Sequence, residues 1–343
     1  MPSRVRIALL AVVVAILGAG AGVLLIRSDD DVTAPASTTS SSTTSPAAPT
    51  TSTTAPTTTT APPVGWPALP TDGVARAVTT PNGLVLAVLS VLDGGRFVAR
   101  SPCGNEVTVF GAPLSGATVV LDPGHGGDEP GAVGPAGARE KDVNLAVALE
   151  TKRELEAQGA TVVLTRTGDY RITLASRAAI AQALHPTVFL SIHHNAEPDE
   201  HRATPGAETY HQIASADSKR LSGLVYEEVV RAFSAFDIDW VADRDAGAKY
   251  RLRDDGGDYY GILNRTAGVP AVLSEAAFIS NPPEEALLVD PAFQAVEAGA
   301  FTQAIIRYVT TADPGSGFVV PYPRTSPAGS GGGAAGCIDP PLG

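Results

Sequence analysis

The chain has 343 residues and a formal net charge of −12 when its six histidines are counted as neutral. That balance argues against nucleic acid or anionic lipid as a partner, because both bind clustered lysines and arginines. The two cysteines, Cys103 and Cys337, are too few for a four-thiolate metal site. In an exported protein they are typical of one disulfide, which we expect them to form, although a mixed or intermolecular disulfide is the alternative.

The N-terminus has the pattern of an exported protein. Arg4 and Arg6 precede twenty consecutive apolar residues, 7–26. A helix of that length spans about 30 Å, the thickness of a bilayer core, and its basic side should stay in the cytoplasm. The length favours an uncleaved membrane anchor over a cleaved signal peptide, whose apolar region is shorter. Both interpretations place the rest of the chain outside the cytoplasm, either anchored and facing a cell wall or secreted.

Two further regions precede the bulk of the chain. Residues 32–64 are rich in Ser, Thr and Pro and carry no charge, which predicts an extended, flexible tether. Short apolar segments follow, separated by turn-forming sequences such as Pro81-Asn82-Gly83, and they predict a small β module. The module could bind wall polymer, but a packing or spacing role is the simpler interpretation. Its expected strands are 74–80, 84–91, 96–100 and 106–110.

From residue 116 onward, apolar strand patterns alternate with helical ones. Such alternation predicts an α/β fold with helices on the faces of a sheet, and sites in these sheets lie at the carboxyl ends of strands. The expected strands are 117–121, 161–165, 187–193 and 271–276. The expected helices are 142–158, 176–184, 215–233 and 291–308.

These observations predict five regions. They are a membrane anchor or signal peptide at 1–27, a disordered linker at 28–64, a β module at 65–114, a catalytic domain at 115–312 and a Gly/Pro-rich tail at 313–343. A bridge between Cys103 and Cys337 would hold the tail against the β module.

Three segments of the α/β region carry candidate metal ligands. His125 lies in a glycine-rich turn after a strand, where a phosphate-binding turn is the alternative. Glu140 lies where the first long helix begins, a position at which a glutamate also simply favours the helix dipole. His193 and His194 end an apolar strand, and because strand side chains alternate, only one of them can face a given site.

Two histidines and one carboxylate around an open coordination position form a known catalytic zinc arrangement. Such a zinc ion activates a water, and the reaction then needs a base. Glu275 is the candidate, because an isolated carboxylate on an apolar strand is costly to bury without partners. The alternative is a structural glutamate held by an arginine or by backbone N–H groups.

Four ordered motifs resemble those of the zinc-dependent N-acetylmuramoyl-L-alanine amidases of the amidase 3 family. The resemblance covers about 116–311, and its only departure in these motifs is His194, where the family usually has alanine. It implies a mixed twisted sheet flanked by helices on both faces. It also implies one zinc ion per chain bound by His125, Glu140 and His193, with Glu275 as catalytic base and acid. The matching segments are 121–127, 139–142, 191–196 and 275–281.

The implied substrate is the amide between N-acetylmuramic acid and L-alanine in peptidoglycan. We expect Asn195 to bind substrate, together with Arg251 and Arg253 from a polar, substrate-facing loop at 237–260, since arginines hold carboxylates bidentately. A solvated surface loop is the alternative for that segment. We expect a monomer that contacts the membrane through its N-terminal helix and binds no nucleic acid. A zinc peptidase acting on stem peptides and a non-catalytic wall-binding protein are the competing hypotheses.

Overall fold

The computed structural model describes residues 64–324 and 332–343. The apolar segment at 7–26 and nearly all of the predicted linker lie outside these residues. Within the described ranges, no helix is both long and apolar enough to cross a membrane.

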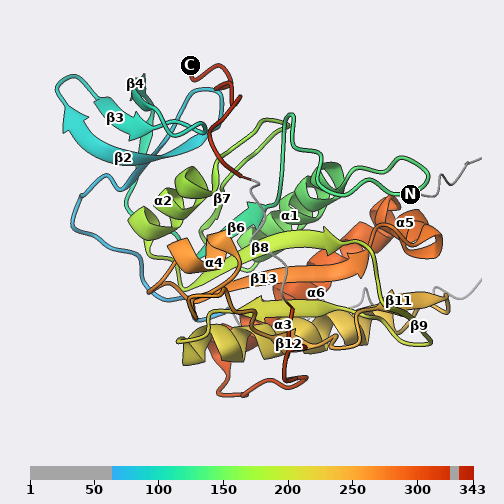
Figure 1. The fold of residues 1–343 in the computed structure, drawn as a ribbon. Coiled ribbons are helices and arrows are strands. Elements are labelled where there is room, and N and C mark those ends of the chain that lie inside the picture. Colours follow the sequence, from blue (N-terminus) through green and yellow to red (C-terminus); the bar gives the residue numbers. More distant parts are fainter. Residues whose placement is uncertain (1–63, 325–331) are drawn as a thin grey trace, which may run out of the picture. The chain divides into compact units, whose positions relative to one another are not determined.

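A six-stranded mixed sheet carries the α/β region, in the strand order β12-β10-β13-β8-β6-β7 (Figure 1). Strands β13, β8, β6 and β7 run parallel, whereas β10 is antiparallel to β13 and parallel to β12. This is the mixed sheet that the family resemblance implies. Its strands are β6 (Val119–Pro123), β7 (Val162–Leu164), β8 (Val188–Asn195), β10 (Glu208–His211), β12 (Ala248–Lys249) and β13 (Ala271–Phe278).

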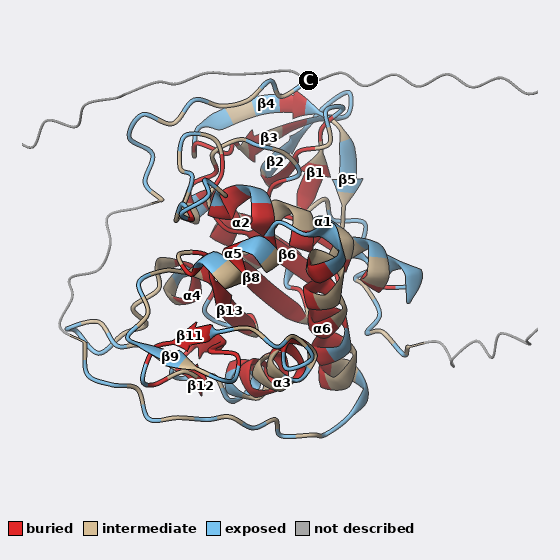
Figure 2. Ribbon diagram, turned by 90° about the vertical axis from the view of Figure 1, so that its right-hand side faces the viewer, coloured by how far each residue is buried: buried red, intermediate tan, exposed pale blue. Residues whose placement is uncertain are grey.

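Helices cover both faces of this sheet, as expected, and the strands between them are buried (Figure 2). The helices on one face, the first group, share a core with Leu190 and Ile192 of β8. The helices on the other face, the second group, share a core with Phe189. Because side chains alternate along a strand, His193 faces the second group and His194 the first. The first group is α1 (Glu140–Ala157), α3 (Ala216–Phe233) and α6 (Pro291–Thr310), and the second is α2 (Leu174–Leu184) and α4 (Gly261–Arg265).

Short elements are the main addition to the predicted pattern. The segment 237–260, expected to be a loop, contains β11 (Trp240–Ala242) and β12, and β11 pairs with β9 (Glu200–Arg202). Helix α5 (Pro282–Leu288) follows β13 directly. Strands of two or three residues are too short to show alternation, so their partners rather than their own sequences define them.

The predicted β module is a five-stranded antiparallel sheet that packs on α2. Ala77 and Val85 of this sheet share one hydrophobic core with Ile180 and Ala181 of α2. The strand order is β4-β3-β2-β1-β5. The strands are β1 (Ala77–Thr79), β2 (Val85–Leu92), β3 (Arg96–Arg100), β4 (Glu106–Phe110) and β5 (Ala112–Leu114).

The C-terminal tail is attached to this module by a disulfide and by hydrogen bonds. Cys103 and Cys337 form the expected disulfide, with their Cα atoms 5.5 Å apart. Asp339 accepts hydrogen bonds from the Ser101 hydroxyl and from the Cys103 amide, both at 2.8 Å. The carbonyl of Gly332 also accepts from the amide of Leu174 at 3.0 Å, so the tail contacts the start of α2 as well.

Candidate metal and catalytic site

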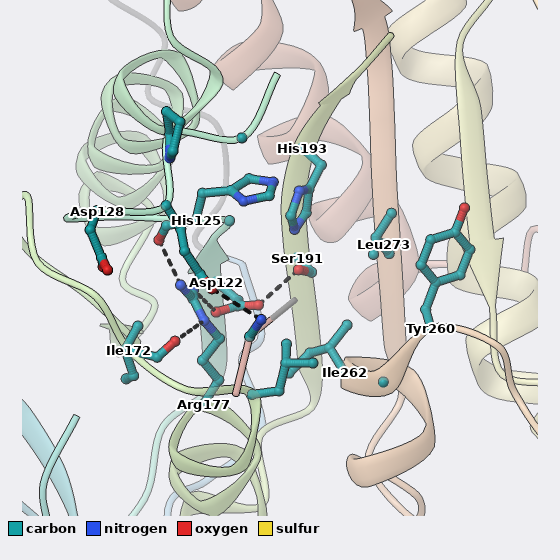
Figure 3. Close-up of a pocket in the computed structure, with 17 residues that line it drawn as sticks. Asp122, His125, Asp128, Ile172, Arg177, Ser191, His193, Tyr260, Ile262 and Leu273 are labelled. Atoms are coloured by element: carbon teal, nitrogen blue, oxygen red, sulfur yellow. Dashed lines mark hydrogen bonds and ion pairs between the residues drawn. The ribbon is translucent and has the colours of Figure 1, made fainter. Parts of the chain in front are cut away.

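Three predicted ligands converge at the carboxyl ends of β6 and β8. His125, Glu140 and His193 each offer one ligand atom, and these atoms lie within 4.8 Å of one another. Nε2 of His125 lies 3.1 Å from Oε2 of Glu140, and Nδ1 of His193 lies 2.9 Å from Oε1. The two imidazole rings meet edge to face, with centroids 4.9 Å apart (Figure 3). This donor set could hold a metal ion.

Two buried arginines fix the turn that presents His125. The residue has a φ of 60°, a left-handed conformation that costs a non-glycine residue about 1–3 kcal/mol and needs support from its surroundings. Arg177 donates to the carbonyls of Pro123 and His125, at 2.7 and 2.6 Å. Arg166 donates to the carbonyl of Gly124 at 2.9 Å. The backbone of the turn is thus held by charged donors from two other segments.

Asp122 anchors the same turn from below (Figure 3). Its Oδ1 accepts from Arg177 at 2.7 Å and from the Thr165 hydroxyl at 2.6 Å, and its Oδ2 accepts from Ser191 at 2.7 Å. Burial raises the pKa of Asp122, but the charge of Arg177 and the three hydrogen bonds outweigh burial and hold the pKa below its ordinary value. The ionised carboxylate therefore ties the carboxyl ends of β6, β7 and β8 together.

Two glycines are required by close contacts within the site. A Cβ atom on Gly124 would lie 2.1 Å from the His193 ring. Gly131 has a φ of +72°, and a Cβ there would lie 2.3 Å from Glu140. The close approach expected of the glycine-rich turn is therefore an approach to another candidate ligand.

Glu140 is the first residue of α1 and receives hydrogen bonds at both oxygens. Oε2 accepts from the Ala132 amide at 2.8 Å, and Oε1 accepts from Asn144 and from the His194 amide, both at 3.2 Å. Burial raises the pKa of Glu140, but hydrogen bonds and charge interactions with His125 and His193 hold it well below the ordinary value. The carboxylate is thus ionised and oriented toward the two imidazoles.

His193 and His194 point to opposite faces of the sheet. His193 lines the cavity described below, and burial is the main cause that lowers its pKa. His194 has no solvent exposure; its Nδ1 lies 2.8 Å from Asn144 Oδ1 and its Nε2 lies 3.2 Å from both oxygens of Glu297. Only His193 lies with the other two candidate ligands.

Glu275 lies beside this group on β13. It pairs in register with His193 on one side and with Glu208 on the other. Its Oε2 is buried and has no hydrogen-bond partner among the described residues. Burial raises the pKa of Glu275 well above its ordinary value, and the carboxylates of Glu140, Glu208 and Asp243 raise it further. Among the described residues, neither an arginine nor a backbone N–H group donates to this oxygen, as the alternative of a purely structural glutamate would require.

A second acidic group, beyond Glu275, is paired with basic side chains. Glu208, Asp243 and Asp245 lie close enough together to suggest a metal site. However, Lys249 donates to Glu208 at 2.9 Å and to Asp245 at 2.7 Å, and Arg324 donates to Asp245 at 2.8 Å. We therefore assign this group as an ion-pair network. The expected substrate-binding residue Asn195 donates to Glu208 at 3.2 Å.

A cavity of about 390 Å³ opens beside His125 and His193. The apolar side chains of Ile172, Ile262 and Leu273 line it next to the two histidines (Figure 3). Its other lining residues include Asp128, Glu129, Leu174, Tyr260 and, from the C-terminal tail, Gly332. An extended substrate could therefore contact an apolar wall while its reacting bond lies at the histidines.

The two predicted substrate-binding arginines lie outside the lining of this cavity. Arg251 stacks on the ring of Tyr259 at 3.7 Å, and Tyr259 precedes the cavity residue Tyr260. Arg253 is ion-paired with Asp255, and its Nε donates to that carboxylate at 3.0 Å. The structure thus brings together His125, Glu140, His193 and Glu275 but not these arginines.

Several residues that support the site were not predicted from the sequence. Asn144 lies one helical turn after Glu140, so the i,i+4 spacing could have identified it. The sequence gives only a weak indication of the roles of Arg166 and Arg177, which is that each is a charged residue near an apolar segment.

The site lies within a segment that matches a known family. A family model described as N-acetylmuramoyl-L-alanine amidase matches residues 119–307. The chain is 32% identical over 216 residues to an uncharacterised protein, YqiI, of Bacillus subtilis (strain 168), covering 62% of this chain and 93% of that protein. It is 30% identical over 212 residues to the germination-specific N-acetylmuramoyl-L-alanine amidase of the same organism, covering 58% and 82%.

Other relatives share a smaller part of their length. The N-acetylmuramoyl-L-alanine amidase AmiC of Neisseria meningitidis serogroup B is 32% identical over 235 residues, and the chain covers only 53% of it. Among solved structures, an N-acetylmuramoyl-L-alanine amidase from Clostridium difficile 630 matches with a TM-score of 0.49 and 31% identity. That match covers 58% of this chain and 100% of the solved chain.

Proposed function

Because the chain belongs to the N-acetylmuramoyl-L-alanine amidase family, we propose that it is a zinc-dependent hydrolase. It cleaves the amide bond between N-acetylmuramic acid and L-alanine in peptidoglycan. The observation that carries this proposal is the convergence of His125, Glu140 and His193 beside Glu275, whose buried oxygen has no hydrogen-bond partner among the described residues.

The donor set fits zinc. Two imidazoles and one carboxylate, with one coordination position left for water, are a ligand set of catalytic zinc sites. Glu140 is ionised, and the pKa of His193 is lowered, so both are in the protonation states that metal ligands need. His125, Glu140 and His193 would hold the ion, which would polarise the amide carbonyl and activate a water.

Glu275 performs the proton transfers in this proposal. It takes a proton from the attacking water as the water oxygen bonds to the carbonyl carbon. It then gives that proton to the amide nitrogen as the C–N bond breaks, so L-alanine leaves with a free amine. Burial raises the pKa of Glu275, which makes its carboxylate a stronger base than an exposed one and lets the protonated form return the proton.

Asn195, Arg251 and Arg253 are our proposed substrate contacts. Asn195 donates to Glu208, which pairs in register with Glu275. Arg251 stacks on Tyr259, the residue before the cavity residue Tyr260. Arg251→Ala and Arg253→Ala, made separately, should raise the KM for a muropeptide and leave the zinc content unchanged. An unchanged KM in both variants would remove the arginines from the proposal.

We propose that the protein acts outside the cytoplasm, in cell-wall turnover or cell separation. The relatives include a probable cell wall amidase, LytH of Staphylococcus aureus, which is 34% identical over 182 residues. The apolar segment at 7–26 would anchor a monomer to the membrane or direct its secretion.

A digest of purified peptidoglycan tests the reaction. The zinc-loaded protein should release intact stem peptides that begin with a free L-alanine amine, together with peptide-free glycan, as identified by mass spectrometry. A chelator should abolish the release, and added zinc should restore it. Cleavage within the stem peptide would identify a peptidase, and no cleavage with bound zinc would leave a wall-binding protein.

A further inference from the structure

A chain of buried polar side chains leads from α6 to the candidate ligand Glu140. Glu297 contacts His194, His194 contacts Asn144, and Asn144 donates to Oε1 of Glu140. Glu297, His194 and Asn144 have no solvent exposure or almost none. These three side chains lie on the face of the sheet opposite the cavity, so none of them touches a substrate.

The contacts determine which way the Asn144 amide faces. Its nitrogen lies 3.2 Å from Glu140 Oε1 and 3.3 Å from the carbonyl of Gly124, and both of these groups accept. Its oxygen therefore faces Nδ1 of His194 at 2.8 Å. Because an amide oxygen can only accept, Nδ1 of His194 must carry a proton.

The contacts of the other ring nitrogen, Nε2, are compatible with a proton on Nδ1. Nε2 lies 3.2 Å from both oxygens of Glu297, so one proton is shared between this nitrogen and the carboxylate. If the proton is on the ring, the pair is an imidazolium and a carboxylate. If it is on Glu297, the ring is neutral. In both states the N–H at Nδ1 remains and donates to Asn144.

We propose that His194 and Glu297 are positioning residues for the metal centre. Glu297 fixes the ring, the ring fixes the Asn144 amide, and the amide donates to Glu140 and to the turn before His125. This inference rests on the proposed metal site and assigns a role to the histidine that departs from the family motif. Partners that orient a metal ligand raise metal affinity about 10–100-fold in other proteins.

The alternative is that His194 and Glu297 are simply a buried polar pair that stabilises the fold. A buried pair makes a modest net contribution to stability, because desolvation offsets its attraction. The two roles therefore differ in what a substitution changes. A structural pair affects the melting temperature alone, whereas a positioning pair affects the metal site at a given stability.

Two substitutions of His194 separate these roles. The side-chain nitrogen of His194→Asn occupies the place of Nδ1 and can still donate to Asn144. The nitrogen of His194→Gln occupies the place of Nε2 and can reach only Glu297. We expect His194→Asn to keep its zinc affinity within about threefold and His194→Gln to lose about 10–100-fold, measured by chelator competition.

The Co²⁺ form provides an independent readout. The visible spectrum of the bound Co²⁺ reports its ligand geometry, so it should change in His194→Gln and stay close to wild type in His194→Asn. Equal zinc affinities and equal spectra in both variants would overturn the proposal, and so would equal losses in both. A wild-type protein that binds no zinc would instead overturn the proposed function.

Asn144→Leu keeps the test decisive if His194→Gln does not fold. Leucine has a similar volume and removes the donor to Glu140, so this variant should lose zinc affinity to the same extent. Where His194→Gln does fold, adding it to Asn144→Leu should cause no further loss, because the path is already broken at Asn144. Additive losses, or full affinity in Asn144→Leu, would contradict the proposal.

Discussion

Glu275 on β13 pairs in register with His193 on the parallel strand β8. Residues paired in this way point to the same face of a sheet, so the proposed base lies beside a proposed ligand. Two neighbouring strands therefore set the spacing between the proposed ligand and the proposed base, and neither residue depends on a loop. A rigid arrangement of this kind is what proton transfer to a reacting group requires.

Replacing Glu275 by glutamine should separate metal binding from catalysis. Glutamine has the same shape but accepts no proton, so the rate of muropeptide cleavage should fall by about 10²–10⁴-fold. The zinc content, measured by elemental analysis, should equal that of the wild type. Glu156→Gln, at an exposed position on α1, is the matched control and should change neither quantity. Activity within a few-fold of wild type in Glu275→Gln would assign the proton transfer to another group.

Gly124→Ala should weaken metal binding although it replaces none of the proposed ligands. The added methyl group would lie 2.1 Å from the His193 ring, and the ring cannot yield without leaving Glu140. We expect the zinc affinity to fall by at least about tenfold, since the ring is a direct ligand in the proposed site. Gly137→Ala is the steric control, because a Cβ there meets nothing within 4 Å. Its φ of +95° strains an alanine, so this variant should lose stability but keep its zinc affinity. Wild-type zinc affinity in Gly124→Ala would show that His193 is not needed as a ligand.

The sequence predicted the sheet with helices on both faces because segments with the pattern of a strand alternate clearly with segments that have the period of a helix. Alternation also indicated that only one of His193 and His194 could join the site, although it could not show which one. The segment at 237–260 was harder to predict, because β11 and β12 are too short to carry a period of their own. Their positions depend on their partner strands β9 and β10.

The supporting residues of the site could not be identified from their own positions. Arg166 and Arg177 come from separate segments and meet the same turn only after β6, β7 and α2 have packed together. Glu297 is one of several acidic residues near the C-terminus, and nothing in its neighbours distinguishes it. Contacts of this kind depend on three-dimensional packing, whereas the glycine and histidine motifs are local.

The buried pair of Asp122 and Arg177 should make stability depend on pH. Asp122→Asn leaves the Arg177 guanidinium buried without its counter-charge, which costs about 3–5 kcal/mol at neutral pH. The pKa of Asp122 is lowered in the folded protein, so its contribution is fully present above the pKa of the unfolded chain, about 3.9. It is lost as the pH falls below that value toward the folded pKa.

The difference between wild type and Asp122→Asn should therefore shrink as the pH falls below about 4, because the wild type alone loses this contribution. Urea unfolding at a series of pH values measures both proteins. Asp142→Asn is the control, because Asp142 pairs with Arg139 at the surface and such pairs contribute about 0–1 kcal/mol. A difference that stays constant down to pH 3 would show that Asp122 is not ionised in the folded protein.

The disulfide should influence substrate binding as well as stability. Gly332, five residues before Cys337, lines the cavity, and its carbonyl accepts from the amide of the cavity residue Leu174 at 3.0 Å. Its own amide donates to Glu129 at 3.1 Å. Replacing both Cys103 and Cys337 by serine removes the covalent link that holds this wall, and should lower the free energy of unfolding by about 2–4 kcal/mol.

The double serine variant should also show a KM several-fold above wild type at equal zinc content, because one wall of the cavity is no longer fixed. Asp339→Ala is the matched control. It removes the hydrogen bonds to Ser101 and Cys103 but keeps the disulfide, so its KM should stay near that of the wild type. If the double variant loses stability but keeps the KM of the wild type, the tail only stabilises the β module, and the substrate does not extend as far as Gly332.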